Sequence, residues 1–354
     1  MTQALIFFNS FLITLSIIFL AVLYRTEKPR RGERLFLLII AYVCILFLGS
    51  ILNTVDGFGK IQLLAWAVFL QLPIFLIAAR IILGKQYRVY GLILIVLSIG
   101  LGLIAIDAFL IEPQWLQVSN YSLKSSKLDQ PIKIVLLADI QTDQPGPYEI
   151  EVLEITAAED PDLVLFAGDY LQIYDQSEYD LELDRFNSIL KGSNLDPPLG
   201  MYAVRGNVEH ENWELLFDGL DVQTFPSTKT LDLGPVSLTG ISLRDSVVPG
   251  FSVEDNDDYH IVLGHSPNFS LGDINVDLLL AGHTHGGQFT IPGIGPILTL
   301  SAVPRRWASG LTEINPGQFL LVSRGIGLER GHAPRMRFFC RPQLVIINLS
   351  PSEK

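Results

Sequence analysis

The sequence predicts an α/β protein whose globular domain is preceded by four transmembrane helices. Three observations lead to this prediction. Residues 1–112 contain four long apolar runs, residues 131–354 alternate between short apolar strands and helical patterns, and five of those strands end on a residue that can bind a metal. Composition agrees, because 49% of the 354 residues are hydrophobic and only 18% are charged, which is more apolar than an average soluble protein.

Each apolar run is near the ~20 residues that a helix needs to cross the hydrocarbon core of a bilayer. The runs cover Ala4–Tyr24, Leu35–Leu52, Ile61–Leu83 and Val89–Ile111. The first run has no basic residue before it and no small-residue cleavage site after it, so we expect a retained span rather than a signal peptide. A buried soluble bundle is the alternative, but four runs almost free of charge would be hard to cover with protein.

The loops between these runs predict their orientation, because positive charge marks the cytoplasmic side of a membrane. The first and third connecting regions are basic, and they carry Arg25, Lys28, Arg30, Arg31, Arg34, Arg80, Lys85 and Arg88. The second loop, 53–60, has one acid and one base. We therefore expect a multi-pass protein of the cytoplasmic (inner) membrane, with the domain after Ile111 outside the cytoplasm.

Residues 113–130 are predicted to form a linker, because 121–130 is polar and holds three serines and two lysines. The domain 131–354 follows. Its first half alternates strands and helices, at Ile132–Ala138, Tyr148–Ala158, Leu163–Ala167, Ser177–Leu190, Gly200–Val204 and Glu211–Phe217. Its second half reads as strands, with an antiparallel region at Val222–Ile241 and further strands at His260–Leu263, Val276–Leu280, Phe289–Leu300, Phe319–Ser323 and Leu344–Leu349. The alternation of the first half predicts α/β layering.

Five of these strands end on potential metal ligands, and in layered α/β folds sites form at the carboxyl ends of strands. The ligands are Asp139, Asp169, Asn207, His265, and His283 with His285. Singly, Asp169 could cap a helix, Asn207 could hold a left-handed turn and His265 could be a core histidine. Their recurrence favours one metal site, in which His283 and His285 serve one metal together or two neighbouring metals.

Composition limits the chemistry and the partners of this site. A set of carboxylates, amides and imidazoles suits divalent Mn, Fe or Zn, whereas a soft thiolate site would need cysteines. The chain has only two, Cys44 and Cys340, which also implies no disulfide framework. The formal charge of −12 argues against a nucleic-acid partner.

The order of these residues resembles the calcineurin-like metallophosphoesterase family. The motifs of that family are D-x-H, G-D, G-N-H-D/E, a lone H and G-H-x-H. Here they stand as Asp139-Ile140-Gln141, Gly168-Asp169, Gly206-Asn207-Val208-Glu209, Gly264-His265 and Gly282-His283-Thr284-His285. The G-H-T-H-G-G-Q stretch and the ending at Ser323–Gly327 and Pro334–Phe338 are similar to bacterial membrane-anchored members, and the resemblance runs from Ile132 to about Leu349.

This resemblance implies a four-layer α/β/β/α sandwich with two divalent metal ions, Mn, Fe or Zn, or else Mg. Asp169 would bridge the two metals. Asp139, His285 and the residue at position 141 would hold the first metal, and Asn207, His265 and His283 the second. A hydroxide that bridges the metals would attack phosphorus, and the metals would stabilise the developing charge.

Two residues depart from the family pattern. Gln141 stands where a histidine ligand is usual, so we expect a first metal that is held loosely or a site that prefers Mn or Mg, with Asp143 as a further candidate ligand. Val208 stands where the family has the histidine that protonates the leaving group, and loss of a general acid costs roughly 10²–10⁴-fold in rate. His210 is the nearest replacement, although it reads equally well as an exposed histidine. We expect good leaving groups to be hydrolysed much better than alkyl esters.

These residues lead to two functional hypotheses. The first is a membrane-anchored phosphoesterase that hydrolyses a phosphomonoester, a phosphodiester or a pyrophosphate. A lipid-linked phosphate or pyrophosphate is one candidate substrate, because enzyme and substrate would share a surface. Arginines that could hold the phosphate are Arg205, Arg305, Arg306 and Arg324, with Arg205 the best placed. The second is a catalytically weakened, metal- or phosphate-binding regulatory module. The nearly complete ligand set favours the enzyme.

Overall fold

The computed structural model describes residues 2–254 and 256–352, which form two compact units. The first contains the apolar helices up to Leu110 together with His332–Arg335. The second contains Ile111–Gly331 and the described residues from Met336 onward. We describe each unit by itself.

The first unit confirms four helical segments that are long and apolar enough to cross a membrane, at Thr2–Arg25, Lys28–Ile51, Gly57–Leu83 and Lys85–Gln114. Its helices are α1 (Thr2–Arg25), α2 (Arg31–Ile51), α3 (Gly57–Trp66), α4 (Leu72–Leu83) and α5 (Arg88–Ile106), with π-helical turns at Ala67–Gln71 and Asp107–Ile111. Large apolar side chains such as Phe7 and Ile81 stay exposed, as expected for surfaces that face lipid.

The two basic connections meet at one end of this unit. The Arg31 guanidinium donates to the carbonyl oxygens of Tyr24 and Thr26 at the end of α1, and to that of Ile82 in α4, at 2.8–3.0 Å. The Tyr87 hydroxyl donates to the Pro29 carbonyl at 2.6 Å. The positive charge of both connections therefore lies on the same side of the helices, as the predicted orientation requires.

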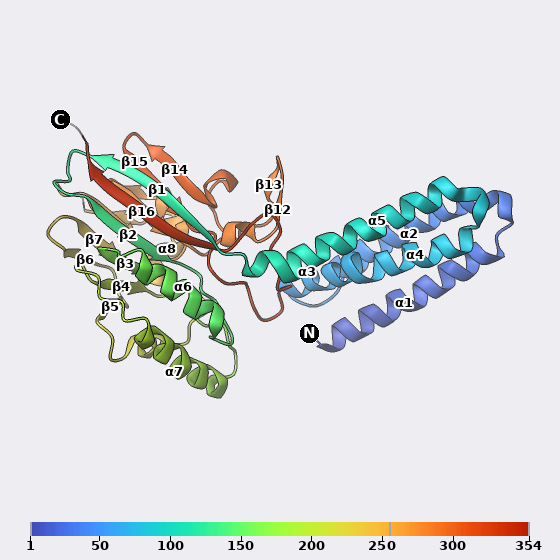
Figure 1. Cartoon of the computed structure of the whole chain (residues 1–354), viewed down its shortest axis with the longest axis horizontal. Helices are drawn as coiled ribbons and strands as arrows, with labels where there is room; N and C mark the ends of the chain where they lie inside the picture. Colours follow the sequence, from blue (N-terminus) through green and yellow to red (C-terminus); the bar gives the residue numbers. More distant parts are fainter. Residues whose placement is uncertain (1, 255, 353–354) are drawn as a thin grey trace. The chain divides into compact units, whose positions relative to one another are not determined.

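The second unit is built on two six-stranded sheets (Figure 1). The first sheet has the order β1 (Gln117–Ser125), β16 (Gln343–Pro351), β2 (Ile132–Leu137), β3 (Leu163–Phe166), β4 (Met201–Val204) and β5 (Val222–Phe225). The second has the order β14 (Gly310–Asn315), β15 (Gln318–Val322), β11 (Leu278–Ala281), β9 (His260–Leu263), β7 (Ser237–Gly240) and β6 (Lys229–Asp232). Two small ladders join β8 (Ser252–Val253) to β10 (Asp273–Ile274), and β12 (Thr290–Ile291) to β13 (Gly295–Pro296).

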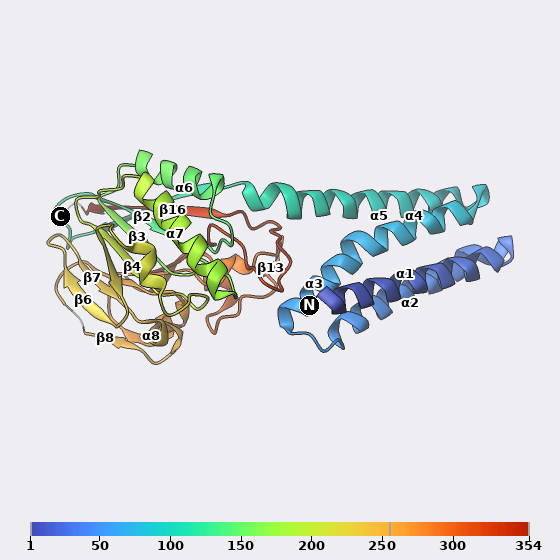
Figure 2. The same ribbon diagram turned by 90° about the horizontal axis from the view of Figure 1, so that it is seen from below.

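The period of two along each strand places apolar side chains on both faces of both sheets. In β2, Ile134 and Leu136 enter the core between the sheets, whereas Val135 and Leu137 pack under α6 (Pro147–Ala158) and α7 (Gln176–Gly192). The outer face of the second sheet packs on the 3-10 turn Pro267–Leu271, which contacts α8 (Leu243–Val247). Figure 2 shows α6 and α7 on one side of the sheets and α8 on the other. The predicted α/β/β/α layers are confirmed, with the second helical layer reduced to short segments.

The predicted linker at residues 113–130 is wrong in its central part, because Gln117–Ser125 forms the edge strand β1. This strand pairs in parallel with β16, from Gln117 opposite Gln343 to Ser125 opposite Pro351. The polar composition of this segment suggested a linker, but an edge strand also keeps polar side chains on its solvent face. Leu123 is buried, while Ser122 and Lys124 are exposed.

Other boundaries in the second half also differ from the prediction. Phe289–Leu300 is not one strand, because Pro292, Gly293, Gly295 and Pro296 leave only the two-residue strands β12 and β13. Within the predicted antiparallel region, β6 and β7 are antiparallel but β5 pairs in parallel with β4. Strand β14 was not predicted, and the helix expected before residue 218 is a 3-10 helix, Trp213–Phe217.

Candidate metal centre

The predicted ligands lie in loops that follow five parallel strands. Strands β2, β3 and β4 are parallel neighbours in the first sheet, and β9 and β11 are parallel neighbours in the second. Their carboxyl ends are followed by Asp139 and Gln141, Asp169, Asn207, His265, and His283 with His285. Backbone hydrogen bonds join these loops, for example from Asp139 N to Gly168 O at 3.0 Å and from Gly282 N to His265 O at 2.9 Å.

Five of the seven predicted ligands have a left-handed backbone, which is uncommon for residues other than glycine. Their φ angles are 49° for Asp139, 37° for Gln141, 56° for Asp169, 70° for His283 and 48° for His285. Such conformations persist only where the surrounding structure holds them, and they cluster at functional sites. The strained left-handed backbone conformations therefore occur at the residues that are predicted to bind metal.

Two motif glycines allow the loops to approach one another. A Cβ atom on Gly282 would lie 2.6 Å from Oδ2 of Asp139, and one on Gly206 would collide with the carboxylate and the backbone nitrogen of Asp169. Any side chain at either position would displace an aspartate from the cluster. The glycines of the G-N and G-H motifs are thus required for close packing of the site.

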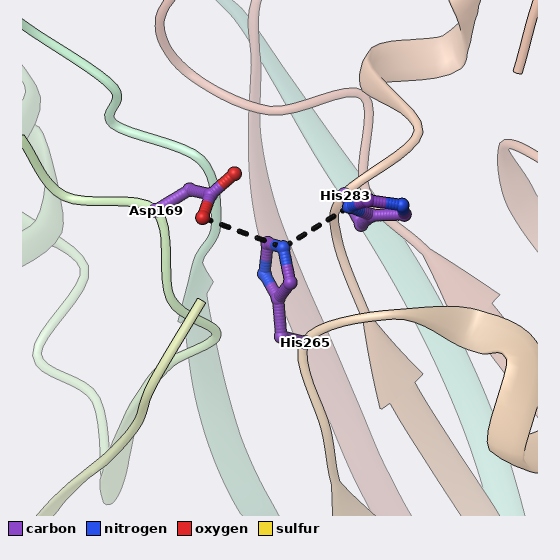
Figure 3. A group of neighbouring side chains, drawn as sticks. All are labelled: Asp169, His265 and His283. Atoms are coloured by element: carbon purple, nitrogen blue, oxygen red, sulfur yellow. Dashed lines mark hydrogen bonds and ion pairs between the residues drawn. The ribbon is translucent and has the colours of Figure 1, made fainter. Parts of the chain in front are cut away.

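Two groups of side chains could each hold a metal ion. One is Asp169, His265 and His283, and the other is Asp139, Asp169 and His285, with the ligand atoms of each group within 4.8 Å of one another. Figure 3 shows the first group, in which the ring of His265 lies between the carboxylate of Asp169 and the ring of His283. Asp169 belongs to both groups.

The hydrogen bonds of His265 and His283 leave a nitrogen lone pair on each ring pointing into the site. The pKa of each imidazole is lowered to about 4, by burial for His265 and by burial together with the proximity of His265 for His283, so both are neutral at pH 7. Nδ1–H of His265 donates to Ala167 O at 2.9 Å, and Nε2–H of His283 donates to Leu300 O at 3.3 Å, since a carbonyl can only accept. The remaining nitrogens of the two rings face each other at 3.2 Å.

Acceptor atoms converge on the free Nε2 of His265. It lies 2.9 Å from Oδ1 of Asn207 and 3.4 Å from Oδ1 of Asp169. Lone pairs repel at these separations, which are those of neighbouring ligands around one ion at roughly 2.1 Å from each. A divalent cation relieves the repulsion.

The second group also contains ligand atoms that have no hydrogen-bond partner. Both ring nitrogens of His285 are buried without a hydrogen-bond partner. The carboxylate of Asp139 is fully buried, and the backbone N–H of His283 donates to both of its oxygens, at 2.8 and 2.9 Å. Burial, reinforced by the charge of Asp169, raises the pKa of Asp139 well above its usual range, and burial raises that of Asp169 to about 7. These donors fit a divalent metal.

Gln141 presents its amide oxygen as the atom available to a metal. Its Nε2 donates to Oε1 of Gln172 at 3.0 Å and to Oε2 of Glu329 at 3.1 Å, whereas its Oε1 is buried without a partner. Gln172 also donates to Glu329, at 2.7 Å. A carboxylate can only accept, so Glu329 fixes the orientation of both amides. Sequence reasoning missed Gln172 and Glu329, because no motif residue marks either of them.

Glu209 and Arg337 hold the ligand loops in place. The buried carboxylate of Glu209 accepts from the backbone N–H groups of Gly206, at 2.7 Å, and Tyr170, and thereby joins the loops after β3 and β4. Burial, and then the charge of Asp169, raises the pKa of Glu209 to about 8. The guanidinium of Arg337, also fully buried, donates to the carbonyls of Arg324, Gly325, Gly327 and Cys340. In the sequence both appeared only as parts of family motifs.

The candidates for substrate chemistry belong to neither metal group. Nε2–H of His210 donates to Ile173 O at 2.7 Å, its Nδ1 lies 2.7 Å from Oε1 of Gln176, and its ring stacks on Tyr179 at 4.1 Å. Arg205 forms an ion pair with Glu211 at 2.8 Å. The side chains of His210 and Arg205 therefore bind groups that are not candidate metal ligands.

The other predicted arginines are also outside the metal groups. Arg305 and Arg306 are exposed, and Arg324 donates to Oε1 of Gln117 at 3.0 Å. Val208 is closer to the ligands, because its backbone N–H donates to Oδ1 of Asp169 at 3.1 Å. A valine therefore stands beside the cluster at the position where the family pattern has a histidine.

A two-sheet sandwich with carboxylates and neutral imidazoles gathered at its strand ends defines a metal-dependent protein of the α/β/β/α class. The family model of the calcineurin-like phosphoesterases matches residues 132–287. The chain belongs to the calcineurin-like metallophosphoesterase family, whose members hydrolyse phosphoester bonds, which confirms the resemblance seen in the motifs.

Bacterial relatives support this assignment. The chain is 30% identical over 227 residues to the uncharacterized metallophosphoesterase YkoQ of Bacillus subtilis, covering 58% of this chain and 82% of that protein. It is 28% identical to an uncharacterized metallophosphoesterase of Aquifex aeolicus, covering 68% of this chain and 94% of that protein. It is 26% identical to phosphodiesterase YaeI of Escherichia coli, covering 67% of this chain and 90% of that protein.

Proposed function

We propose that the chain is a membrane-anchored phosphoesterase that binds two divalent metal ions and hydrolyses a phosphomonoester, a phosphodiester or a pyrophosphate. The observation that carries this proposal is the presence of Asp169 in both groups of candidate ligands. One carboxylate shared by two groups suits a bridge between two adjacent metals.

The ligands divide between the two ions according to these groups. Asp139, His285 and the amide oxygen of Gln141 would hold the first ion, Asn207, His265 and His283 would hold the second, and Asp169 would contact both. When bound, two such ions neutralise the charge of a phosphate and lower the pKa of a coordinated water. The chain itself positions these ligands and keeps its imidazoles neutral. Mn, Fe and Zn suit this set, and Mg is the alternative.

The amide at position 141 is expected to shift the metal preference of the first ion. A neutral oxygen donor favours Mn²⁺ or Mg²⁺, whereas imidazole favours Zn²⁺. We predict that Gln141→His increases the affinity for zinc by about tenfold or more. Competition with a fluorescent zinc chelator measures this affinity. Gln223→His adds an imidazole on exposed β5 and serves as the control. Equal zinc affinities in Gln141→His and the parent chain would contradict the assignment.

The membrane helices support a location and a class of substrate. The basic connections lie together at one end of the first unit, which favours an orientation with that end in the cytoplasm and the catalytic unit outside it. An enzyme anchored in this way in the inner membrane shares a surface with lipids, so we propose a lipid-linked phosphate as substrate. The name of the Escherichia coli relative favours a phosphodiester.

Hydrolysis of activated aryl esters tests the proposed function. Val208 supplies no proton to a leaving group, so substrates with good leaving groups suit the assay. We expect the full chain in detergent to hydrolyse a nitrophenyl phosphodiester or monoester with Mn²⁺, and to lose this activity with a chelator. Folded protein that shows no activity with Mn, Zn, Fe, Co or Mg would contradict the proposal. It would favour the regulatory module, to which Val208 and the fully engaged ring of His210 already point.

A further inference from the structure

The segment Ile291–Leu300, which contains β12 and β13, presents apolar side chains to solvent. Its exposed residues are Ile294, Ile297, Leu298 and Leu300, and 65% of the surface of Ile294 is accessible. Two prolines and two glycines keep this hairpin from joining either large sheet. Four large apolar side chains exposed within seven residues are typical of a segment that contacts another apolar surface.

The hairpin borders the candidate metal centre. The carbonyl oxygen of Leu300 accepts the Nε2–H bond of His283 at 3.3 Å. Gly287, two residues after His285, packs so closely on the hairpin that a Cβ atom there would lie 2.6 Å from Cβ of Pro296. The exposed apolar side chains of the hairpin therefore lie on a segment that contacts the candidate ligand loop.

The chain enters the second unit at the same end as the hairpin. Glu112, just after the fourth apolar run, accepts from the backbone N–H groups of Phe339, at 2.8 Å, and Cys340. Phe338 stacks on Phe289 at 5.1 Å, and Ile297 N donates to Phe289 O at 3.3 Å. In Figure 1, β12 and β13 lie at the end of the unit where β1 begins. The preceding apolar run is long enough to cross a bilayer, so the chain joins the second unit at the end where the hairpin also lies.

Basic residues lie next to the hairpin, and an exposed aromatic residue lies just before β1. Arg305 and Arg306 are exposed on a 3-10 turn that packs against β13, and neither forms an ion pair with any residue in 2–254 or 256–352. Trp115 is exposed and stacks under the guanidinium of Arg341 at 3.4 Å. An apolar hairpin with adjacent exposed arginines, on a unit that also exposes a tryptophan just before β1, has the composition of an element that binds at the interface of an anionic membrane.

We propose that the hairpin Ile291–Leu300 inserts its apolar side chains into the lipid bilayer, with Arg305 and Arg306 facing anionic headgroups. The metal centre then opens at the membrane surface, where it takes a phosphate carried by a lipid. The exposed apolar side chains and the position of the hairpin support membrane insertion. The lipid substrate, in contrast, rests on the proposed function.

A fluorescent reporter on the hairpin tests insertion. The full chain with Cys44→Ser and Ile294→Cys is labelled with an environment-sensitive dye and reconstituted in vesicles of phosphatidylcholine and phosphatidylglycerol, while Cys340 stays buried. We expect blue-shifted emission that is mostly lost when the lipids carry bromine on their acyl chains. The matched reporter is Ser126→Cys, in the turn after β1, about 30 Å along the strand from its membrane end. Quenching at position 294 no greater than at 126 would overturn the proposal.

Two further measurements separate insertion from the substrate. Removing phosphatidylglycerol, or replacing both arginines by glutamine, should reduce quenching at position 294, and no change would overturn the role of the headgroups. The double variant Ile294→Asp/Ile297→Asp should hydrolyse a long-chain lipid phosphate in vesicles more slowly than the parent. Equal rates would overturn the role of the hairpin in presenting the lipid, and a parent that hydrolyses aryl esters but not this lipid would overturn the lipid substrate. Insertion is measured without turnover, so a hairpin that inserts in an inactive protein contradicts only the proposed function.

Discussion

Replacing Asp169 by asparagine is expected to reduce hydrolysis by at least about 10³-fold, because metal stabilisation of the transition state contributes several kcal/mol. Asp169 belongs to both ligand groups, so the change weakens both ions rather than one. An amide also cannot supply the negative charge that a bridge between two cations requires. The measurements are the initial rate with an aryl phosphodiester and the metal content of the purified protein by elemental analysis.

A matched variant distinguishes this effect from a general change of charge. Asp218→Asn makes the same substitution at an exposed aspartate after the 3-10 helix Trp213–Phe217. We expect it to keep the metal content and the rate of the parent. If Asp169→Asn retained both bound metals and more than roughly a tenth of the rate, a loss below 1.4 kcal/mol, Asp169 would not bridge the site.

Arg337→Met is expected to destabilise the second unit by about 3–5 kcal/mol. The guanidinium is fully buried and donates to four backbone carbonyls, which methionine would leave without a donor. These carbonyls shape the loop Arg324–Gly327, whose Gly327 N donates to Asp139 O at 2.7 Å. We therefore expect a lower metal content as well. Thermal unfolding followed by tryptophan fluorescence should show a midpoint lower by roughly 6–20 °C.

Two other arginine variants serve as controls for this prediction. Arg185→Met removes an exposed guanidinium that forms an ion pair with Glu182 at 3.5 Å, and should change stability by less than about 0.5 kcal/mol. Arg337→Lys keeps a charge but cannot reach four carbonyls with one ammonium group, so we expect an intermediate loss. An equal unfolding midpoint for Arg337→Met and Arg185→Met would show that the buried hydrogen bonds of Arg337 do not stabilise the second unit.

The sequence by itself determined the four apolar helices, the α/β class and the positions of the candidate ligands. Apolar runs of about 20 residues identify spans without any tertiary contact. Asp139, Asp169, His265, His283 and His285 each follow a short apolar strand, and the parallel pairing of those strands brings these residues into two adjoining groups. The long apolar runs and the short apolar strands that end on a ligand are both local patterns. Each can be recognised from residues that are neighbours in the sequence.

Only the tertiary structure decided which distant segments support the site. The polar strand β1 pairs with β16, more than 200 residues away, and the orientation of Gln141 depends on Glu329, 188 residues away. Phe289–Leu300 has the apolar composition of a strand, yet its prolines and glycines leave it exposed beside His283. The partner of an edge strand or of a buried amide is set by the segment that tertiary packing places beside it. The spacing of residues along the chain therefore does not predict which distant segment that is.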